Sequence, residues 1–382
     1  MNHRRNSTPG LQGILIVVAA AIASIACSSE APAPPRFGPP TGLHQANSPV
    51  TTPQQSGTLN RLQAVSPVDE DVVWASGVGG TYALTTDGGE TWVSHVVPGA
   101  EKLQFRDVQG VSAKVAYLLS AGPGTDSRIY QTEDGGKSWK LQFQAPDDPN
   151  SFYDCFAFWS PKRALVMGDG VNGRFPVLRT KDGETWKDIG NNLPAAQDGE
   201  GAFAASGTCV ATQGSRRAWI VTTNSRIFAT TDGGDQWAAH ATPIAGGTGT
   251  AGVFTVAFRD RSHGLIGGGD FLAAGTLDNV ARSKDGGKTW QLTAPAPVPG
   301  AVFGLSYTRG SGDEEEEDGE QHGDGVQQTA VVTGPGGTAW TPDEGNSWHS
   351  LPGVTGYWAV AFANPRAGWL VGTKGRILRI SF

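Results

Sequence analysis

The chain has 382 residues, enough for one large all-β domain or for two or three domains of ordinary size. Glycine accounts for 54 residues and only 17% of residues are charged, a composition that suits many short strands joined by tight turns. The net charge of −7 argues against nucleic acid as a partner, because phosphate binding depends on a basic surface.

Residues 1–26 are expected to be a signal peptide. Arg4 and Arg5 precede a continuous stretch of about 14 apolar or small residues, which is too short to cross a bilayer of about 30 Å as a helix. Cys27 follows a segment that resembles the lipobox of bacterial lipoproteins, although leucine is usual where Ser24 stands. We therefore expect an exported protein, periplasmic or on the outer surface, anchored in the membrane by a lipid on Cys27. Cleavage near the alanine-rich stretch, releasing a soluble protein, is the alternative.

The segment that follows, residues 27–55, is rich in proline and poor in apolar residues. Such a composition predicts an extended, disordered tether. The folded body is then expected to span residues 56–382.

A short motif repeats through this body. Thr85-Thr86-Asp87-Gly88-Gly89-Glu90-Thr91-Trp92 has five further versions, in which the closing tryptophans follow at intervals of 47, 47, 51, 53 and 58 residues. This is the Asp box, or BNR repeat. Its aspartates are Asp87, Asp134, Asp182, Asp232, Asp285 and Asp343. Six copies at the spacing of propeller blades predict a β-propeller.

The residue types of the box indicate a structural turn. The carboxylate accepts hydrogen bonds from its own turn, the glycines supply positive φ, and the tryptophan packs between sheets. We expect each box to join the third and fourth strands of a blade and to belong to the scaffold.

A seventh blade is predicted after the last box. Three strands are expected at Tyr357–Phe362, Gly368–Gly372 and Arg376–Ile380, and the outermost strand is missing. The segment around Ser56–Asn60 is expected to supply it, which would close the ring and leave no free sheet edge. The fold class is therefore all-β, a single seven-bladed propeller closed by an N-terminal strand.

Residues 310–328 form an insertion in the sixth blade with an unbroken acidic run, Asp313–Asp318. A block of like charge predicts a solvated, disordered loop. Calcium binding is the alternative, but the run lacks the spaced ligands and turn glycine of a calcium loop.

The top face, where the innermost strands begin and the second strands end, is the expected binding surface. Acidic side chains, one arginine and aromatic rings gather there, and such a set suits a polar ligand or a peptide. The candidate residues are Arg106, Asp107, Tyr153, Asp154, Asp169, Glu200, Asp270 and Trp358. The alternative is that they cap the channel and satisfy backbone groups of the loops.

Motifs for cofactors are not evident. The glycine patterns at 168–173 and 247–252 lie among strands, whereas a dinucleotide fingerprint needs a helix after it. The sequence predicts no metal site, no cofactor and no catalytic motif. Cys155 and Cys209 are not in a CxxC pair; they are expected either to form a disulfide or to be small buried residues.

Three segments resemble the photosystem II stability/assembly factor-like propellers of non-photosynthetic bacteria. They are Ser151–Trp159 (SFYDCFAFW), Gly199–Thr208 (GEGAFAASGT) and Gly252–Asp260 (GVFTVAFRD). The resemblance implies a monomeric module that binds a protein or peptide partner during assembly in the cell envelope.

An enzyme of the BNR/sialidase-like class is the alternative function. Sialidases need an arginine triad and a tyrosine nucleophile, and no convincing triad is present. A hydrolase acting on glycans or other polymers would use two of Asp154, Asp169, Glu200 and Asp270 as a carboxylate pair.

Overall fold

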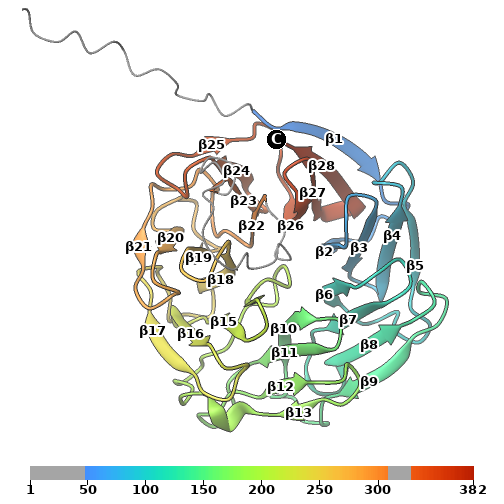
Figure 1. Cartoon of the computed structure of the whole chain (residues 1–382), viewed down its shortest axis with the longest axis horizontal. Helices are drawn as coiled ribbons and strands as arrows, with labels where there is room; N and C mark the ends of the chain where they lie inside the picture. Colours follow the sequence, from blue (N-terminus) through green and yellow to red (C-terminus); the bar gives the residue numbers. More distant parts are fainter. Residues whose placement is uncertain (1–47, 309–327) are drawn as a thin grey trace, which may run out of the picture. The chain divides into compact units, whose positions relative to one another are not determined.

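The computed structural model describes residues 48–308 and 328–382. In this part of the chain, seven four-stranded antiparallel sheets stand as blades around a central axis (Figure 1). The prediction of an all-β, seven-bladed propeller is confirmed.

In six blades the strands follow one another in sequence order from the centre outward, and in the seventh β1 is the outermost strand. Blades one to four contain β2 (Leu62–Pro67), β3 (Val72–Gly77), β4 (Thr81–Thr86), β5 (Val93–Val96); β6 (Phe105–Gly110), β7 (Ala116–Ser120), β8 (Arg128–Thr132), β9 (Lys140–Gln144); β10 (Tyr153–Ser160), β11 (Arg163–Gly168), β12 (Val177–Thr180), β13 (Lys187–Asp188); β14 (Val210–Gln213), β15 (Arg217–Val221), β16 (Arg226–Thr230) and β17 (Ala238–Ala241). Blades five to seven contain β18 (Ala251–Phe258), β19 (Gly264–Asp270), β20 (Val280–Ser283), β21 (Gln291–Leu292); β22 (Gly304–Tyr307), β23 (Ala330–Gly334), β24 (Gly337–Thr341), β25 (His349–Ser350); β26 (Tyr357–Asn364), β27 (Ala367–Gly372), β28 (Arg376–Ser381) and β1 (Val50–Gln55). Short 3₁₀ turns, η1 (Gly124–Asp126), η2 (Gly190–Asn192) and η3 (Thr373–Gly375), join some of them.

The first strand of each blade faces the centre of the ring. Figure 1 shows β2, β6, β10, β18, β22 and β26 around the axis, with β5, β9, β13, β21 and β25 at the rim. Strand β7 is buried along its whole length, because neighbouring blades cover both of its faces. Its sequence, AYLLS, accordingly lacks the alternation of a half-exposed strand.

The ring closes with an N-terminal strand, but not the expected one. Strand β1 pairs antiparallel with β28 at the outer edge of the seventh blade. The closing strand is therefore residues 50–55, which we had expected to end the disordered tether, and Ser56–Asn60 form the turn that follows. Pro53 is one of the prolines that suggested disorder in this segment. Proline has no backbone N–H to donate, but an edge strand does not need this donor on its outer side, so Pro53 is compatible with β1.

Gln54 ties the closing strand to two blades. Its Oε1 accepts hydrogen bonds from the indole N–H groups of Trp92 at 3.0 Å and Trp369 at 3.1 Å, and its Nε2 donates to the carbonyl of Gly88. Trp92 closes the Asp box of the first blade and Trp369 lies in the seventh. One side chain thus connects the first and last blades of the ring.

The hydrophobic core lies between the blades. Trp74, Trp219 and Trp369, each on the second strand of its blade, are among the most buried side chains. Trp74 of the first blade packs in one cluster with Phe105 and Leu118 of the second. The blades are therefore held together mainly by side chains from their facing surfaces.

The Asp boxes form the expected turns between third and fourth strands. Asp87 Oδ1 accepts hydrogen bonds from the Thr85 hydroxyl and the Thr91 amide, and its Oδ2 accepts from the Thr91 hydroxyl. These bonds, with those from Thr91 foremost, lower the pKa of Asp87 to about 2. Asp134, Asp285 and Asp343 repeat all three bonds. Asp182 and Asp232 keep the hydroxyl and amide bonds to Oδ1. Each of these five carboxyl groups has a pKa below the ordinary value.

Several predictions from sequence concern parts of the chain outside the described residues. They are the signal peptide at 1–26, lipidation at Cys27, most of the tether at 27–55 and nearly all of the acidic insertion at 310–328. In residues 48–308 and 328–382, no helix is long and apolar enough to cross a membrane.

Candidate functional site

A cavity of about 740 Å³ opens on the top face over blades two to four. Its volume falls in the range of about 300–1,000 Å³ that is usual for ligand sites. Four of the eight candidate residues line it: Arg106, Asp154, Asp169 and Glu200. The rest of the lining comes mainly from loop residues 148–152, 170–172 and 199–204.

Asp154 is brought to the cavity by a β-bulge. The pairing of β10 with β11 shifts by one residue between Tyr153 and Cys155, so Asp154 is the extra residue. Only 1% of Asp154 is exposed, and its Oδ2 has no hydrogen-bond partner within the described chain. A buried acceptor without a partner is rare in proteins, so this oxygen is available to a bound group.

Asp154 and Asp169 form an interacting carboxyl pair, in which each residue shifts the pKa of the other. Asp169 directly follows β11, and its Oδ1 also accepts the Ala202 amide at 3.0 Å. Burial raises the pKa of Asp154 well above its usual value; the negative charge and hydrogen bond of Asp169 raise it further, while the positive charge of Arg106 opposes the shift. Burial also raises the pKa of Asp169, although its hydrogen bonds to Ala202 and Asp154 lower it in part. The pair therefore favours a state in which Asp154 keeps its proton and donates it to Asp169.

Arg106 lies beside this pair and is fixed by its neighbours. Its guanidinium donates to the carbonyl of Ala204 at 3.1 Å and to Oε1 of Gln104 at 2.8 Å, while its Nε has no hydrogen-bond partner in the described residues. Burial lowers the pKa of Arg106, and the charge of Arg61 lowers it further.

Glu200 lines the cavity but is already bound. Its two carboxylate oxygens form a bidentate ion pair with Nε and Nη2 of Arg226, and they also accept hydrogen bonds from the Thr222 hydroxyl and the Gln197 amide. These contacts hold the loop before the fourth blade in place. Glu200 is thus placed as a structural residue of the cavity wall.

The cavity is acidic. Its charged lining residues are one arginine, Arg106, and four carboxyl groups, Asp148, Asp154, Asp169 and Glu200. Arg226 neutralises Glu200, and a proton shared by Asp154 and Asp169 removes one more negative charge. The remaining balance is one cation against two anions, which favours a positively charged ligand group.

The other four candidates do not line the cavity. The buried Asp107 carboxylate accepts the amides of Val108 and Phe156, each at 2.8 Å, and so joins the second blade to the third. Tyr153 packs edge-on against Phe143, and burial raises its pKa to about 12. Asp270 accepts the Leu272 amide in its own loop.

Trp358, the fourth of these residues, belongs to a ring around the channel. Five innermost strands carry a bulge at the same place, and their extra residues are Gln63, Arg106, Asp154, Phe254 and Trp358. In this ring the first blades supply polar groups and the last ones aromatic rings. Sequence reasoning missed Gln63 and Phe254, although aligning the innermost strands of the repeats would have placed them beside Arg106.

The aromatic part of the ring is packed tightly. Phe203, from the loop before the fourth blade, stacks on Phe254 with 3.8 Å between ring centroids, and Phe254 stacks on Phe303. Trp358 meets Phe303 edge-on and carries the guanidinium of Arg61 over its face at 4.4 Å. These rings pack against one another beside the cavity, which is itself open and holds the two acids Asp154 and Asp169.

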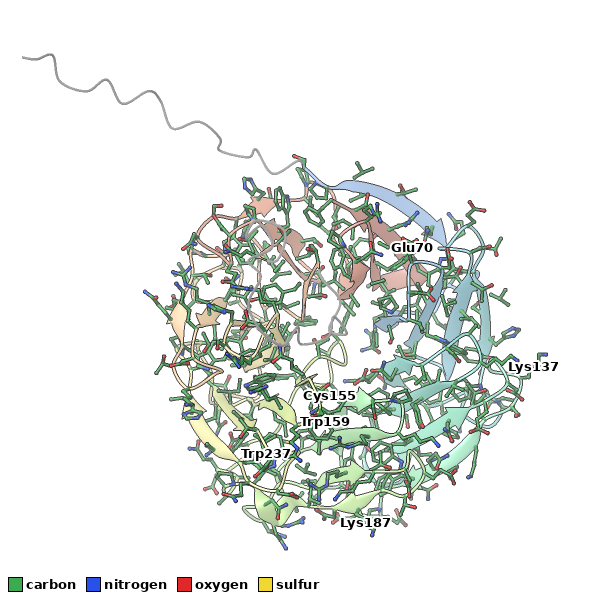
Figure 2. The ribbon with its side chains drawn as sticks, in the orientation of Figure 1. Glu70, Lys137, Cys155, Trp159, Lys187 and Trp237 are labelled. Atoms are coloured by element: carbon green, nitrogen blue, oxygen red, sulfur yellow. A yellow bond between two sulfur atoms is a disulfide. The ribbon has the colours of Figure 1, made fainter. Side chains whose placement is uncertain are left out.

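A disulfide joins Cys155 to Cys209, which settles the alternative left by the sequence (Figure 2). It links β10, directly after Asp154, to the residue before β14. Figure 2 shows Cys155 nearer the centre of the ring than Lys137 and Lys187 at the rim. The crosslink therefore fixes the loop that carries Glu200 against the strand that carries Asp154.

The two glycine patterns are turns at the edge of the same region. Val171 bridges to Arg174 and Thr248 to Ala251, and each bridge closes a tight turn. Gly170 and Gly249 line the cavity, but no helix follows either pattern in the part of the chain that the structure describes. That same part holds no group of three or more His, Cys, Asp or Glu side chains arranged to bind a metal.

No model of a known protein family matches the chain, and no curated protein matches it in sequence. Among solved structures, YCF48 from Cyanidioschyzon merolae has a TM-score of 0.59 at 16% identity, covering 87% of this chain and 98% of its own. YCF48 bound to D1 peptide has a TM-score of 0.59 at 18% identity, with coverages of 88% and 98%.

A GH74 xyloglucanase from Xanthomonas campestris is also similar. Its TM-score is 0.56 at 14% identity, covering 86% of this chain and 53% of the xyloglucanase. At these identities the likeness shows a shared propeller fold. The likeness to the two YCF48 structures is consistent with the resemblance to assembly-factor propellers. The likeness to the xyloglucanase shows that a hydrolase contains a similar propeller.

Proposed function

We propose that this propeller is a binding module that receives a segment of a protein or peptide partner in the cavity of the top face, and that the segment inserts a basic group there. The observation that carries the proposal is the buried Asp154 oxygen, without a partner in the described chain, beside Asp169 in an acidic cavity of about 740 Å³. An ammonium or guanidinium group would donate to this oxygen and displace the proton that the two carboxyl groups share.

The similar structure of YCF48 bound to D1 peptide supports the binding class, because it shows that a propeller of this fold can take a peptide. We further propose that the partner is met during assembly in the cell envelope, where this chain acts as a monomer. The YCF48 propellers are related to this chain by fold alone, so the identity of the partner has to come from experiment.

Selection from a library of random peptides tests the proposal. The full chain is used as bait, alongside the double variant Asp154→Asn/Asp169→Asn, which removes the acidic groups while keeping their size. Asp270→Asn is the matched control, because Asp270 lies at the same end of a neighbouring blade but does not line the cavity. We expect peptides containing lysine or arginine to bind the wild type and the control but not the double variant. Equal enrichment by all three proteins would refute this site.

Export and a lipid anchor at Cys27 remain part of the proposal. They rest on Arg4, Arg5 and the lipobox-like segment before Cys27. Mass spectrometry of the mature N-terminus decides the matter: a diacylglycerol-modified Cys27 is expected, and an unmodified residue elsewhere would exclude the anchor.

A hydrolase is the second candidate, and the Asp154–Asp169 pair is the observation that favours it. Two carboxyl groups that share a proton are the arrangement of aspartic proteases. A glycosidase pair would need its carboxyl groups roughly 5–5.5 Å or 6.5–9.5 Å apart. Turnover of a panel of peptides and glycans that is lost in Asp169→Asn would establish this reading.

A further inference from the structure

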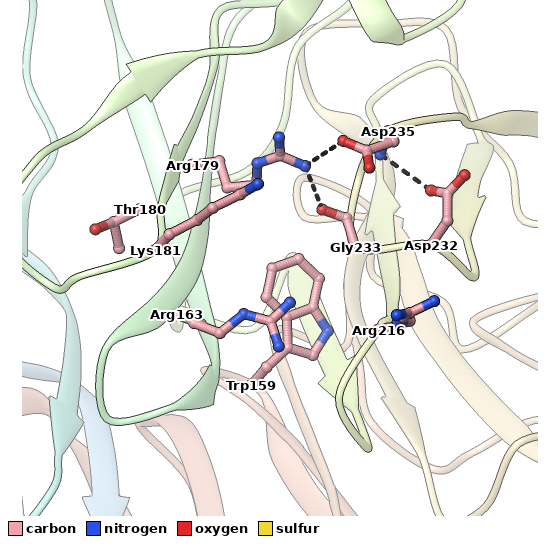
Figure 3. A pocket seen from close by; sticks show the side chains of 9 residues that line it. All are labelled: Trp159, Arg163, Arg179, Thr180, Lys181, Arg216, Asp232, Gly233 and Asp235. Atoms are coloured by element: carbon pink, nitrogen blue, oxygen red, sulfur yellow. Dashed lines mark hydrogen bonds and ion pairs between the residues drawn. The ribbon is translucent and has the colours of Figure 1, made fainter.

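A second pocket lies at the opposite ends of the strands that bear the cavity. Strand β10 begins at Tyr153, beside the cavity, and ends at Ser160, next to the pocket residue Trp159. The pocket holds about 250 Å³ between blades three and four (Figure 3). Its lining residues are Trp159, Arg163, Arg179, Thr180, Lys181, Arg216, Asp232, Gly233 and Asp235.

The charge of this pocket is the reverse of that of the cavity. Four cations, from Arg163, Arg179, Lys181 and Arg216, face two carboxylates, those of Asp232 and Asp235. The lining therefore carries a net charge of +2, in a chain whose net charge is −7.

The two carboxylates are already engaged. Asp235 accepts a hydrogen bond at 2.7 Å from Arg179, which also donates to the Gly233 carbonyl (Figure 3). Asp232 is the aspartate of the fourth Asp-box turn, and its Oδ1 accepts the hydroxyl of Thr230 and the amide of Asp235. Neither carboxylate makes an ion pair with the other three cations.

Arg163, Lys181 and Arg216 therefore have no acidic partner among residues 48–308 and 328–382. Arg163 lies instead over the ring of Trp159, 5.6 Å from its centroid. The Trp159 indole N–H donates to the Arg217 carbonyl at 2.5 Å, which fixes the plane of the ring. The pocket thus combines a rigid aromatic wall with three uncompensated cations.

The basic residues of this pocket are not required by the blade repeat. The turn between the first two strands carries Lys162-Arg163 in the third blade and Arg216-Arg217 in the fourth, but Asp69-Glu70-Asp71 in the first. The repeat itself does not require basic residues at this turn. The cations are therefore a local addition to the scaffold.

We propose that this pocket is a second binding site, which takes a small ligand made of a ring and a dianionic group, such as a sugar phosphate. A phosphate monoester carries a charge near −2 at neutral pH, which matches the +2 of the lining, and guanidinium groups pair well with it. Arg163 covers the Trp159 ring on one side, and the part of the ring that remains open to the pocket offers an apolar surface for the ligand ring. A volume of about 250 Å³ is below the range of drug-sized ligands and limits the occupant to about one ring with its phosphate.

Calorimetric titration of the full chain with glucose 6-phosphate tests this site. Glucose, inorganic phosphate and glucuronate, a monoanion, are the comparison probes. We expect glucose 6-phosphate to bind most tightly and glucose not to bind, and binding should weaken as salt is added. In the double variant Arg163→Gln/Arg216→Gln the affinity should fall by about tenfold or more, because two charge-assisted contacts are lost.

The matched control is Arg366→Gln, which changes an exposed arginine at the same turn of the seventh blade. Its affinity should equal that of the wild type. The site is refuted if the wild type shows no binding up to about 10 mM glucose 6-phosphate. It is also refuted if the double variant binds as well as the control. Glucuronate binding as tightly as glucose 6-phosphate would contradict the preference for a dianion. None of these results depends on the peptide site, since the two pockets share no lining residue.

Discussion

Aspartate side chains in this molecule have opposite acid strengths because their surroundings differ. Asp87 and Asp134 in the Asp boxes accept hydrogen bonds from hydroxyl and amide groups, and their pKa falls to about 2. Asp154 is buried next to Asp169, and its pKa is raised well above the usual value. The box residues are thus fixed as anions of the scaffold, whereas Asp154 keeps a proton that a bound cation can displace.

The substitution Asp154→Asn should therefore stabilise the protein more at high pH than at low pH. The folded-state pKa of Asp154 lies above the unfolded value of about 3.9, so the wild type loses stability as pH rises from about 4 through the folded pKa. Asparagine keeps the hydrogen bond to Asp169 without this cost. The gain should amount to about 1.4 kcal/mol for each unit by which the pKa is raised.

Urea unfolding of both proteins from pH 4 to pH 8 measures this difference. The buried Asp107 also has a raised pKa, but it is present in both proteins and cancels in the comparison. Arg106 and Asp169, the charged groups that face Asp154, are present in both proteins, and because the titration of Asp169 is coupled to that of Asp154 the difference reports on the pair. A stability difference that stays constant with pH would contradict the raised pKa.

At the level of elements, the strand pattern was predictable and the closing strand was not. The strands expected for the seventh blade at Tyr357–Phe362, Gly368–Gly372 and Arg376–Ile380 match β26, β27 and β28 within two residues. The regular spacing of the boxes made this possible. Strand β1 escaped prediction because its backbone pairs with β28, more than 300 residues away, and its sequence, VTTPQQ, has few apolar residues to mark it.

We predict that Gln54→Ala weakens the ring closure. The substitution leaves the indole N–H groups of Trp92 and Trp369 without their acceptor, and each buried donor left unpaired costs about 1–3 kcal/mol. The free energy of unfolding should therefore fall by about 2 kcal/mol or more in a urea titration. Gln55→Ala is the control, because Gln55 is exposed on the same strand. Equal stability of the two variants would show that Gln54 does not hold the ring closed.

For the whole molecule, the candidate site was predictable only in part. The order of strands indicated which residues lie on the top face, and four of the eight meet in the cavity. The sequence did not reveal that Arg226 neutralises Glu200, or that a bulge turns Asp154 toward Asp169, because both depend on packing between distant segments.

The disulfide between Cys155 and Cys209 ties the third blade to the fourth. Its two cysteines are 54 residues apart in the sequence. Closing a loop of this length lowers the entropy of the unfolded chain, which corresponds to about 4 kcal/mol of unfolding free energy. The double variant Cys155→Ala/Cys209→Ala should lose about 2–4 kcal/mol of unfolding free energy in denaturant titrations. Reduction of the wild type should reproduce the effect, and an unchanged denaturation midpoint would contradict it.

Site-specific photo-crosslinking tests the central claim, that the acidic cavity binds a peptide segment, most directly. A photoreactive phenylalanine replaces Asn150, an exposed residue at the cavity, or Lys137, an exposed residue of an Asp-box turn on the opposite face. Each protein is irradiated with a basic peptide obtained from the library selection. The account predicts a crosslink from position 150 that is lost in the Asp154→Asn/Asp169→Asn background, and none from position 137. Crosslinking from position 137 alone, or from position 150 regardless of the two aspartates, would contradict it.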